Sequence, residues 1–224
     1  MLSLFMAMAT LLAVVLGSLV IAAVYDEVVD FVGFDRRYRI DTGLISWIGA
    51  SSERSALVHR QYMPSPVRTV RSLLAALPID HAAYTLIDLG SGKGRTLFIG
   101  AESGFAKCIG VEQSADLCQT SRRNLTAWQR VSRSTAPVEI VCGDARTFAL
   151  PPEPIVIYMY NPFPKDVMER VVKNISQSYQ ERPRPIFVIT VHPRFDAYIL
   201  SHKFLRPLSL PSARTDFFSA FATA

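Results

Sequence analysis

Residues 86–95 read Leu-Ile-Asp-Leu-Gly-Ser-Gly-Lys-Gly-Arg, and this stretch decides the fold. The apolar run over 84–89 predicts a β-strand, and the residues from 95 to 103 predict a helix. Between them, glycines at three alternate positions let the backbone turn sharply and approach a ligand closely, and the helix start offers free N–H groups. Such a strand–turn–helix unit occurs in many nucleotide-binding folds.

Two familiar phosphate-binding motifs do not fit this turn. A P-loop requires a glycine five positions before the Gly-Lys pair and a hydroxyl residue after it. Here Ile87 takes the first place and Gly94 follows Lys93. A dinucleotide fingerprint requires Gly-x-Gly-x-x-Gly, and the third glycine comes one residue early. The sequence therefore disfavours a P-loop nucleotidase and an oxidoreductase of the Rossmann type.

The rest of the chain alternates between predicted strands and helices. Further strands are expected over 108–111, 138–141, 155–160 and 185–191, helices over 66–77, 115–128 and 165–180, and a final strand pair within 204–221. The 155–160 strand is apolar on both faces, as expected inside a parallel sheet. This alternation predicts an α/β fold with a doubly wound, mostly parallel sheet and helices on both faces.

Two acids follow the next two predicted strands. Glu112 ends the second strand, where a carboxylate can accept both hydroxyls of a ribose, and Asp144 follows the third, where it can accept an adenine amino group. Alternatively, Glu112 is a solvated strand end and Asp144 a helix N-cap. Because parallel strands bring their carboxyl ends to one edge, the order acid–glycines–acid–acid favours a single ligand site.

Residues 88–163 resemble the class I S-adenosylmethionine-dependent methyltransferases, which have a seven-strand Rossmann-like sheet. Residues 88–94 look like the first motif of that family, Glu112 like its acid after the second strand, and Gly143-Asp144 like its adenine-site motif. The resemblance implies S-adenosyl-L-methionine as cofactor. The cofactor-binding residues that it implies are Tyr62, Asp88, Gly90, Ser91, Gly92, Gly94, Glu112, Asp144 and Ala145.

A further motif, Tyr-Met-Tyr-Asn-Pro-Phe over 158–163, ends the central strand. It is similar to the Asn-Pro-Pro-Tyr motif of methyltransferases that act on planar amino groups, which implies Asn161 as the catalytic residue and Tyr160, Pro162 and Phe163 as substrate-binding residues. One proline in place of two argues against a flat nucleobase as acceptor. The alternative is an ordinary strand exit with proline as its terminator.

The segment before the glycine turn is similar to another group. An apolar N-terminus, then Tyr62-Met63-Pro64-Ser65, then the glycine turn resembles the membrane-anchored protein-lysine methyltransferases of mitochondria. That resemblance implies that Tyr62 covers the cofactor and that the methyl acceptor is an amine, specifically a protein lysine. A loop aromatic that packs on the domain surface is the alternative for Tyr62.

The first 25 residues predict a transmembrane helix. The run from Leu4 to Val24 carries no charge and has the length to span a bilayer as a helix. A cleaved signal peptide is disfavoured because no Lys or Arg precedes the run. Arg36, Arg37 and Arg39 follow it, which predicts a single-pass protein whose catalytic domain faces the cytoplasm. The predicted organisation is a membrane helix over 1–25, a connector and cofactor-covering loop over 26–65, and a methyltransferase domain over 66–224.

Composition limits the other function classes. The net charge is +5, but no run of Lys and Arg has interleaved aromatics, so nucleic acid is not an expected partner. Cys108, Cys118 and Cys142 match no zinc or Cys-x-x-Cys pattern, so no metal is expected and each thiol is predicted to be a small buried hydrophobe. Lys93 is expected to be exposed, and the histidines to serve surface or packing roles. A membrane-tethered binding module without catalysis remains the alternative to an enzyme.

Overall fold

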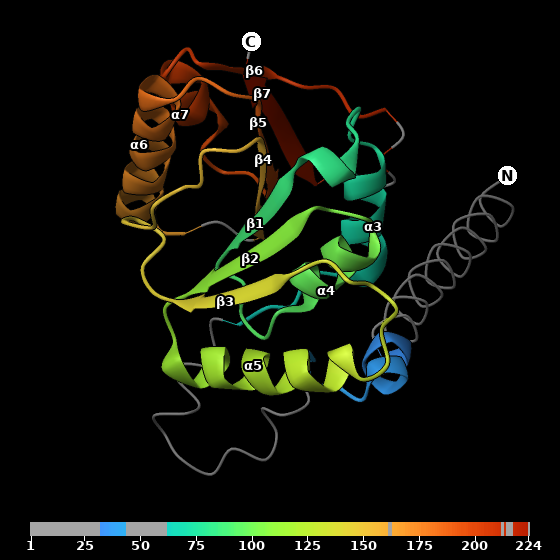
Figure 1. Cartoon of the computed structure of the whole chain (residues 1–224). Coiled ribbons are helices and arrows are strands. Elements are labelled where there is room, and N and C mark those ends of the chain that lie inside the picture. The colour runs from blue at the N-terminus through green and yellow to red at the C-terminus, as the bar shows by residue number, and fades with distance from the viewer. Residues whose placement is uncertain (1–31, 44–61, 161–162, 212, 214–216, 224) are drawn as a thin grey trace, which may run out of the picture.

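The computed structural model describes residues 32–43, 62–160, 163–211, 213 and 217–223 (Figure 1). They form an α/β unit around one seven-stranded sheet in the order β3-β2-β1-β4-β5-β7-β6. The strands are β1 Thr85–Leu89, β2 Lys107–Glu112, β3 Val138–Cys142, β4 Ile155–Tyr160, β5 Ile186–Val191, β6 Leu205–Pro207 and β7 Phe218–Thr223. The first five are parallel, and β7 runs antiparallel to both β5 and β6. The predicted doubly wound sheet and final strand pair are confirmed.

The order of the strands reverses beside β1. The chain runs outward from β1 through β2 to β3, then returns to place β4 on the other side of β1 and continues outward to β5. All five residues of β1 are buried, and so are the first five of β4, because helices cover both faces of the sheet. In such sheets ligands bind at the carboxyl ends of the strands where the order reverses, here at the ends of β1 and β4.

Two layers of helices enclose the sheet, as Figure 1 shows. One core joins α3 (Val67–Ala75), α4 (Arg95–Glu102) and α5 (Ala115–Gln129) to one face, and the other joins α6 (Lys165–Glu181) and α7 (Asp196–Ser201) to the opposite face. Successive residues of a strand point to opposite faces, so Leu86 lies in the first core and Ile87 in the second. A short 3₁₀ helix, His81–Ala83, leads into β1.

Residues 32–43 belong to the same packed unit. Residues 32–38 are helical, and their apolar side chains Phe34 and Tyr38 are buried in the first core. The Tyr38 ring lies 6.5 Å from the ring of Trp128 on α5. The Asn124 side chain of α5 holds both the backbone N–H and the carbonyl of Asp41, at 2.9 and 2.7 Å. Part of the predicted connector is therefore fixed against the catalytic domain.

Two further expectations concern the N-terminus and the cysteines. The predicted membrane helix over 1–25 lies outside the described residues, and within the described part no helix has the length and apolarity to span a bilayer. Cys118 on α5 and Cys142 at the end of β3 form a disulfide, with Cα atoms 5.9 Å apart. The prediction of a small buried hydrophobe is wrong for this pair, because the fold joins residues 24 positions apart that no local spacing links. Cys108 is buried and free as predicted.

Candidate functional site

The glycine turn after β1 has the backbone that the sequence predicts. Gly90, Gly92 and Gly94 adopt φ angles of 87°, 54° and 93°, a region that side chains with a Cβ disfavour. The N–H groups of Gly90 and Ser91 both donate to the carbonyl of Val111 on β2, at 2.8 and 3.1 Å. The turn is thereby fixed to the neighbouring strand, and Gly94 is the N-cap of α4.

Asp88 is the acid within the turn's own strand. It is only 4% exposed, and it lines a small cavity together with Gly90, Ser91 and Tyr160. The pKa of the Asp88 carboxyl is raised to about 7, mainly because the group is buried; a hydrogen bond with Thr96 lowers this pKa in part, and the Glu112 charge adds to the rise. A carboxyl with this pKa changes charge near neutral pH, so it responds strongly to a cation placed beside it.

Glu112 organises the turn through both carboxylate oxygens. Oε2 accepts the N–H of Gly92 at 2.9 Å, and Oε1 accepts the N–H of Ser114, the N-cap of α5, at 2.8 Å. The carboxylate is thus aimed across the glycine turn and is not a freely solvated strand end. Each oxygen keeps a second lone pair, so the same group can accept ribose hydroxyls.

Asp144 lies beyond β3 and is engaged by a residue that the sequence analysis missed. Its two carboxylate oxygens accept from Arg146 Nε at 2.9 and 2.8 Å, and Oδ1 also accepts the Arg146 backbone N–H at 2.9 Å. These bonds hold the pKa of the Asp144 carboxyl below its usual range. Gly143 N donates to the Glu112 carbonyl at 2.9 Å, so the two acidic loops adjoin. Ala145, also a predicted cofactor contact, is buried beside them.

Tyr62 lies against the glycine turn. A Cβ added at Gly92 would collide with the Tyr62 ring, so the absence of a side chain at that position permits the contact. The Tyr62 hydroxyl donates to the carbonyl of Thr42 at 2.8 Å. The ring is therefore held between the turn and residues 32–43.

Lys93 is 1% exposed, and the expectation of an exposed lysine at the start of a helix is wrong. Its ammonium group points away from the cavity to Asp41 Oδ1 at 3.1 Å and the Gly43 carbonyl at 2.8 Å, and it lies 5.3 Å from the centre of the Tyr62 ring. The reason is that residues 32–43 cover the turn from behind. No spacing in the sequence connects Asp41 with Lys93.

A second buried cation, Arg95, follows the turn. Its Nε donates to Thr42 Oγ1 at 2.8 Å, and one terminal nitrogen donates to the Ser65 carbonyl at 3.2 Å. Asp35 lies 3.6 Å from the other terminal nitrogen. Arg95 therefore ties three parts of the chain together, and it also lines the small cavity beside Asp88.

The predicted acceptor side lies at the ends of β4 and β5. Tyr160 ends β4, and the Phe163 ring lies beside Gly90, 3.6 Å from where a Cβ would stand. The predicted catalytic Asn161 and the predicted substrate contact Pro162 lie outside the described residues. The described site thus brings together Tyr62, Asp88, the glycine turn, Glu112, Asp144, Ala145, Tyr160 and Phe163 at one edge of the sheet.

His192 also belongs to this edge, although no spacing pattern singled it out. It follows β5, it is exposed, and its backbone has a φ of 56°, a left-handed conformation that is uncommon outside glycine. Its N–H donates to the Phe217 carbonyl at 2.8 Å, and its ring lies 5.4 Å from Tyr160 and 6.0 Å from Phe217. An aromatic rim therefore borders the end of β4.

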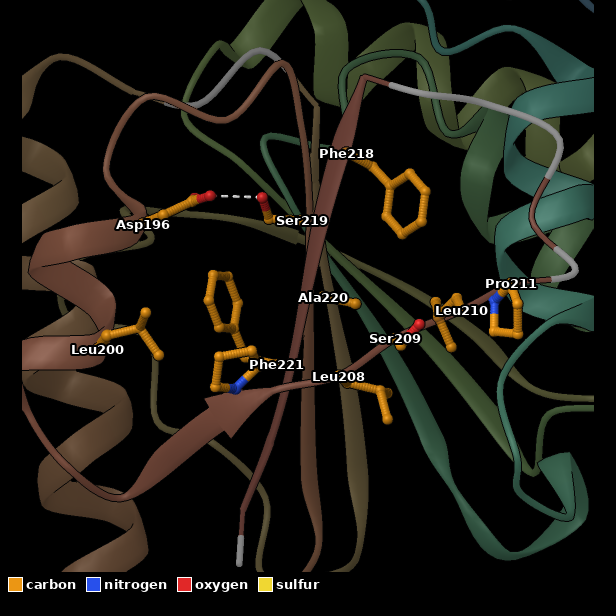
Figure 2. Close-up of a pocket in the computed structure, with 11 residues that line it drawn as sticks. Asp196, Leu200, Leu208, Ser209, Leu210, Pro211, Phe218, Ser219, Ala220 and Phe221 are labelled. Atoms are coloured by element: carbon orange, nitrogen blue, oxygen red, sulfur yellow. Dashed lines mark hydrogen bonds between the residues drawn. The ribbon is translucent and has the colours of Figure 1, made fainter.

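A larger groove, about 440 Å³, lies along β6 and β7 (Figure 2). Apolar side chains from α7, β7 and the segment after β6 line most of it, and Asp196 Oδ2 accepts from Ser219 Oγ at 2.5 Å on one side. None of the predicted site residues lines this groove. Among the described residues no cluster of His, Cys, Asp and Glu could hold a metal ion.

Comparisons with known proteins agree with this geometry at the level of the fold. The solved structure of the mitomycin 7-O-methyltransferase MmcR superposes with a TM-score of 0.56 at 16% identity, over 82% of this chain and 61% of that one. Magnesium protoporphyrin IX methyltransferase (ChlM) from Synechocystis PCC 6803, solved with bound SAH, superposes with a TM-score of 0.52 at 14% identity, over 90% of this chain and 99% of that one. The chain has the methyltransferase fold.

The similarity in sequence covers a smaller part of the chain. A trans-aconitate 2-methyltransferase from Azoarcus sp. (strain BH72) is 34% identical over 85 residues, which is 35% of this chain and 33% of that enzyme. No family model matches the chain. The chain therefore shares a methyltransferase fold with proteins of diverse acceptors, and its own activity has to be inferred from its site.

Proposed function

We propose that the chain is an S-adenosylmethionine-dependent methyltransferase that transfers a methyl group to an amine at a membrane surface. One observation carries the proposal: the glycine turn and the acids Asp88, Glu112 and Asp144 lie at or beside the carboxyl ends of three adjacent parallel strands. The fold shared with known methyltransferases supports it. A dinucleotide-dependent oxidoreductase is disfavoured by the glycine spacing.

The residues present fit the cofactor. The positive φ angles of the glycine turn suit a close approach of a ligand to its backbone, Asp88 would offer a carboxylate to the methionine end, Glu112 to the ribose and Asp144 to the adenine. When bound, S-adenosylmethionine supplies an electrophilic methyl group on a sulfonium. The chain's own part is then to orient both partners, exclude water and hold the acceptor's lone pair in line with the methyl–sulfur axis.

An amine acceptor follows from the motif at the end of β4. The Asn161 carboxamide oxygen would accept an N–H of the incoming amine, and the Tyr160 and Phe163 rings would enclose its alkyl chain. We favour a protein lysine over a nucleobase because a single proline precedes the aromatic residue. The uncharged run from Leu4 to Val24 supports attachment to the membrane, which would restrict encounters to acceptors at the same surface.

The test uses full-length protein in detergent or vesicles. Calorimetry is expected to show binding of S-adenosylmethionine and S-adenosylhomocysteine but not of NAD. Binding of NAD alone would make the chain an oxidoreductase. Cofactor binding without transfer of labelled methyl to any membrane extract would make it a binding module.

Asn161→Ala tests the role of the carboxamide. We expect cofactor affinity to stay the same and transfer of labelled methyl to fall about 10²-fold, the usual cost of lost positioning. If this variant transfers labelled methyl at the wild-type rate, Asn161 has only a structural role at the exit of the strand. A labelled lipid or small molecule in place of a labelled protein would overturn the preference for lysine.

A further inference from the structure

Exposed arginines gather at one corner of the domain, on the side away from α6. The helix of residues 32–38 lies beside the end of α5, where the chain turns into the segment that leads to β3 (Figure 1). The 6.5 Å contact between the rings of Tyr38 and Trp128 fixes this arrangement. The arginine corner consists of the exposed residues Arg36, Arg37, Arg39, Arg130 and Arg133.

Among the residues that the structure describes, the carboxylates near the arginine corner are occupied by other partners. Asp35 accepts the Thr42 N–H at 2.8 Å, and Asp41 pairs with the buried ammonium of Lys93. Glu102 pairs with Arg71 at 3.4 Å. None of the five arginines forms an ion pair with a carboxylate of the described residues. The corner therefore presents positive charge to solvent and fits an anionic partner.

The chemistry of the corner favours lipid over nucleic acid. Its aromatic residues Phe34, Tyr38 and Trp128 are all buried, so it offers no ring on which a base could stack. Val131, by contrast, is 44% exposed between Arg130 and Arg133. Guanidinium groups around an exposed aliphatic side chain suit phosphate headgroups above acyl chains.

The position of the corner in the chain points the same way. The uncharged run ends at Val24, eight residues before the helix that carries Arg36 and Arg37, and Arg39 follows that helix directly. Even fully extended, eight residues reach at most about 30 Å. If the run spans a bilayer, as proposed above, the arginine corner must stay close to the membrane surface.

We propose that the arginine corner is a docking surface for anionic phospholipid headgroups. This inference rests on the proposed membrane attachment and adds a second, electrostatic contact to it. Because residues 35–43 also bond to Lys93, Arg95 and Tyr62, the docked face lies directly behind the glycine turn. The membrane contact thereby orients the cofactor site relative to the bilayer.

The test compares full-length protein in vesicles of phosphatidylcholine alone and of phosphatidylcholine mixed with phosphatidylglycerol. At low salt, amide exchange over 32–43 and 129–133 is expected to slow about tenfold or more in the anionic vesicles, and the difference should vanish in high salt. Arg36→Gln/Arg37→Gln/Arg39→Gln should abolish the difference. The matched control, Lys173→Gln/Arg182→Gln/Arg206→Gln, removes three exposed cations elsewhere and should preserve it.

Cofactor calorimetry on the same samples shows that each variant is folded. Equal rates of amide exchange in both kinds of vesicle would overturn the docking surface without contradicting the membrane helix. If the protein floats with anionic vesicles only, and the triple arginine variant does not float, the docking surface is supported and the membrane helix is overturned. If the protein floats with neither kind of vesicle, both proposals are overturned. Slower exchange with polyuridylate but not with phosphatidylglycerol would overturn the lipid assignment in favour of RNA.

Discussion

The two sides of the glycine turn differ in charge and in the range of their contacts. In front, Asp88 lines the cavity, and Glu112 and Asp144 lie at the ends of the next two strands, each within a few residues of a strand end. Behind, Lys93 and Arg95 bring buried positive charge, although Arg95 also lines the cavity, and their partners lie 30 to 60 positions away in the sequence. The front, with Asp88, Glu112 and Asp144, carries the proposed chemistry. The back, where residues 32–43 contact Lys93 and Arg95, holds the turn in the shape that this chemistry needs.

Deleting residues 32–43 is expected to have the largest effect. A chain that starts at residue 44 leaves the Lys93 ammonium without Asp41 and the Gly43 carbonyl, and the Arg95 guanidinium without Asp35 and Thr42. Breaking one buried ion pair by removing a partner costs about 3–5 kcal/mol, so the loss at both cations should unfold the domain. Circular dichroism during thermal melting is the measurement.

A chain that starts at residue 32 is the matched control, and it should melt cooperatively and bind S-adenosylmethionine. Equal melting temperatures for the two truncations would show that the back of the turn contributes nothing to the fold.

Asp88→Asn probes the front and should move stability and binding in opposite directions. Burial raises the pKa of Asp88 from its ordinary value of 3.8 to about 7, so the folded state holds a proton that the unfolded state releases between these values. The stability of the ligand-free protein therefore falls as pH rises through this window, by up to about 4 kcal/mol. The variant should have a higher melting temperature than wild type at pH 8 and nearly the same one at pH 4.

Its affinity for S-adenosylmethionine should be lower, because the charge proposed to face the methionine ammonium is gone. A variant that is less stable than wild type at pH 8, or that binds the cofactor as tightly, would contradict the role given to Asp88.

The contrast between front and back also shows what the sequence can reveal. The doubly wound fold, the alternation of strands and helices and the positions of Asp88, Glu112 and Asp144 follow from local patterns, because a strand, its turn and its terminal acid are contiguous. The back could not be predicted in this way. The contacts of Lys93 and Arg95 depend on a helix at 32–38 whose short length gives no clear period.

Arg146 and His192 illustrate two further limits. The bond of Arg146 to Asp144 is local, two residues apart, but Asp-x-Arg is too common a pattern to mark a site. His192 acquires its surroundings only when β5 pairs with β7 and brings Phe217 beside it. The disulfide between Cys118 and Cys142 has the same origin, since packing of α5 beside β3 unites them.

Glu112→Ala should have a smaller effect than Asp88→Asn, and one confined mostly to binding. The variant loses the acceptor for the N–H groups of Gly92 and Ser114 as well as the proposed contact with the ribose. Leaving the ribose hydroxyls of the bound cofactor without an acceptor costs about 1–3 kcal/mol, so cofactor affinity should fall about 5- to 150-fold. Glu112→Gln keeps an oxygen acceptor and should recover part of the loss in calorimetry. Full affinity in the alanine variant would return Glu112 to a role in strand termination.

The smallest expected effect is at Tyr62, which touches both sides of the turn. Tyr62→Phe keeps the ring against Gly92 and removes only the hydrogen bond from the hydroxyl to the Thr42 carbonyl. One such bond contributes about 1 kcal/mol, so the melting temperature should fall by a few degrees while cofactor affinity stays the same. Tyr62→Ala removes the ring as well and should weaken cofactor binding, because the predicted cover of the cofactor is lost. If the two variants bind the cofactor equally well, Tyr62 belongs to the back alone, and the loop that precedes the domain supports the turn without covering the ligand.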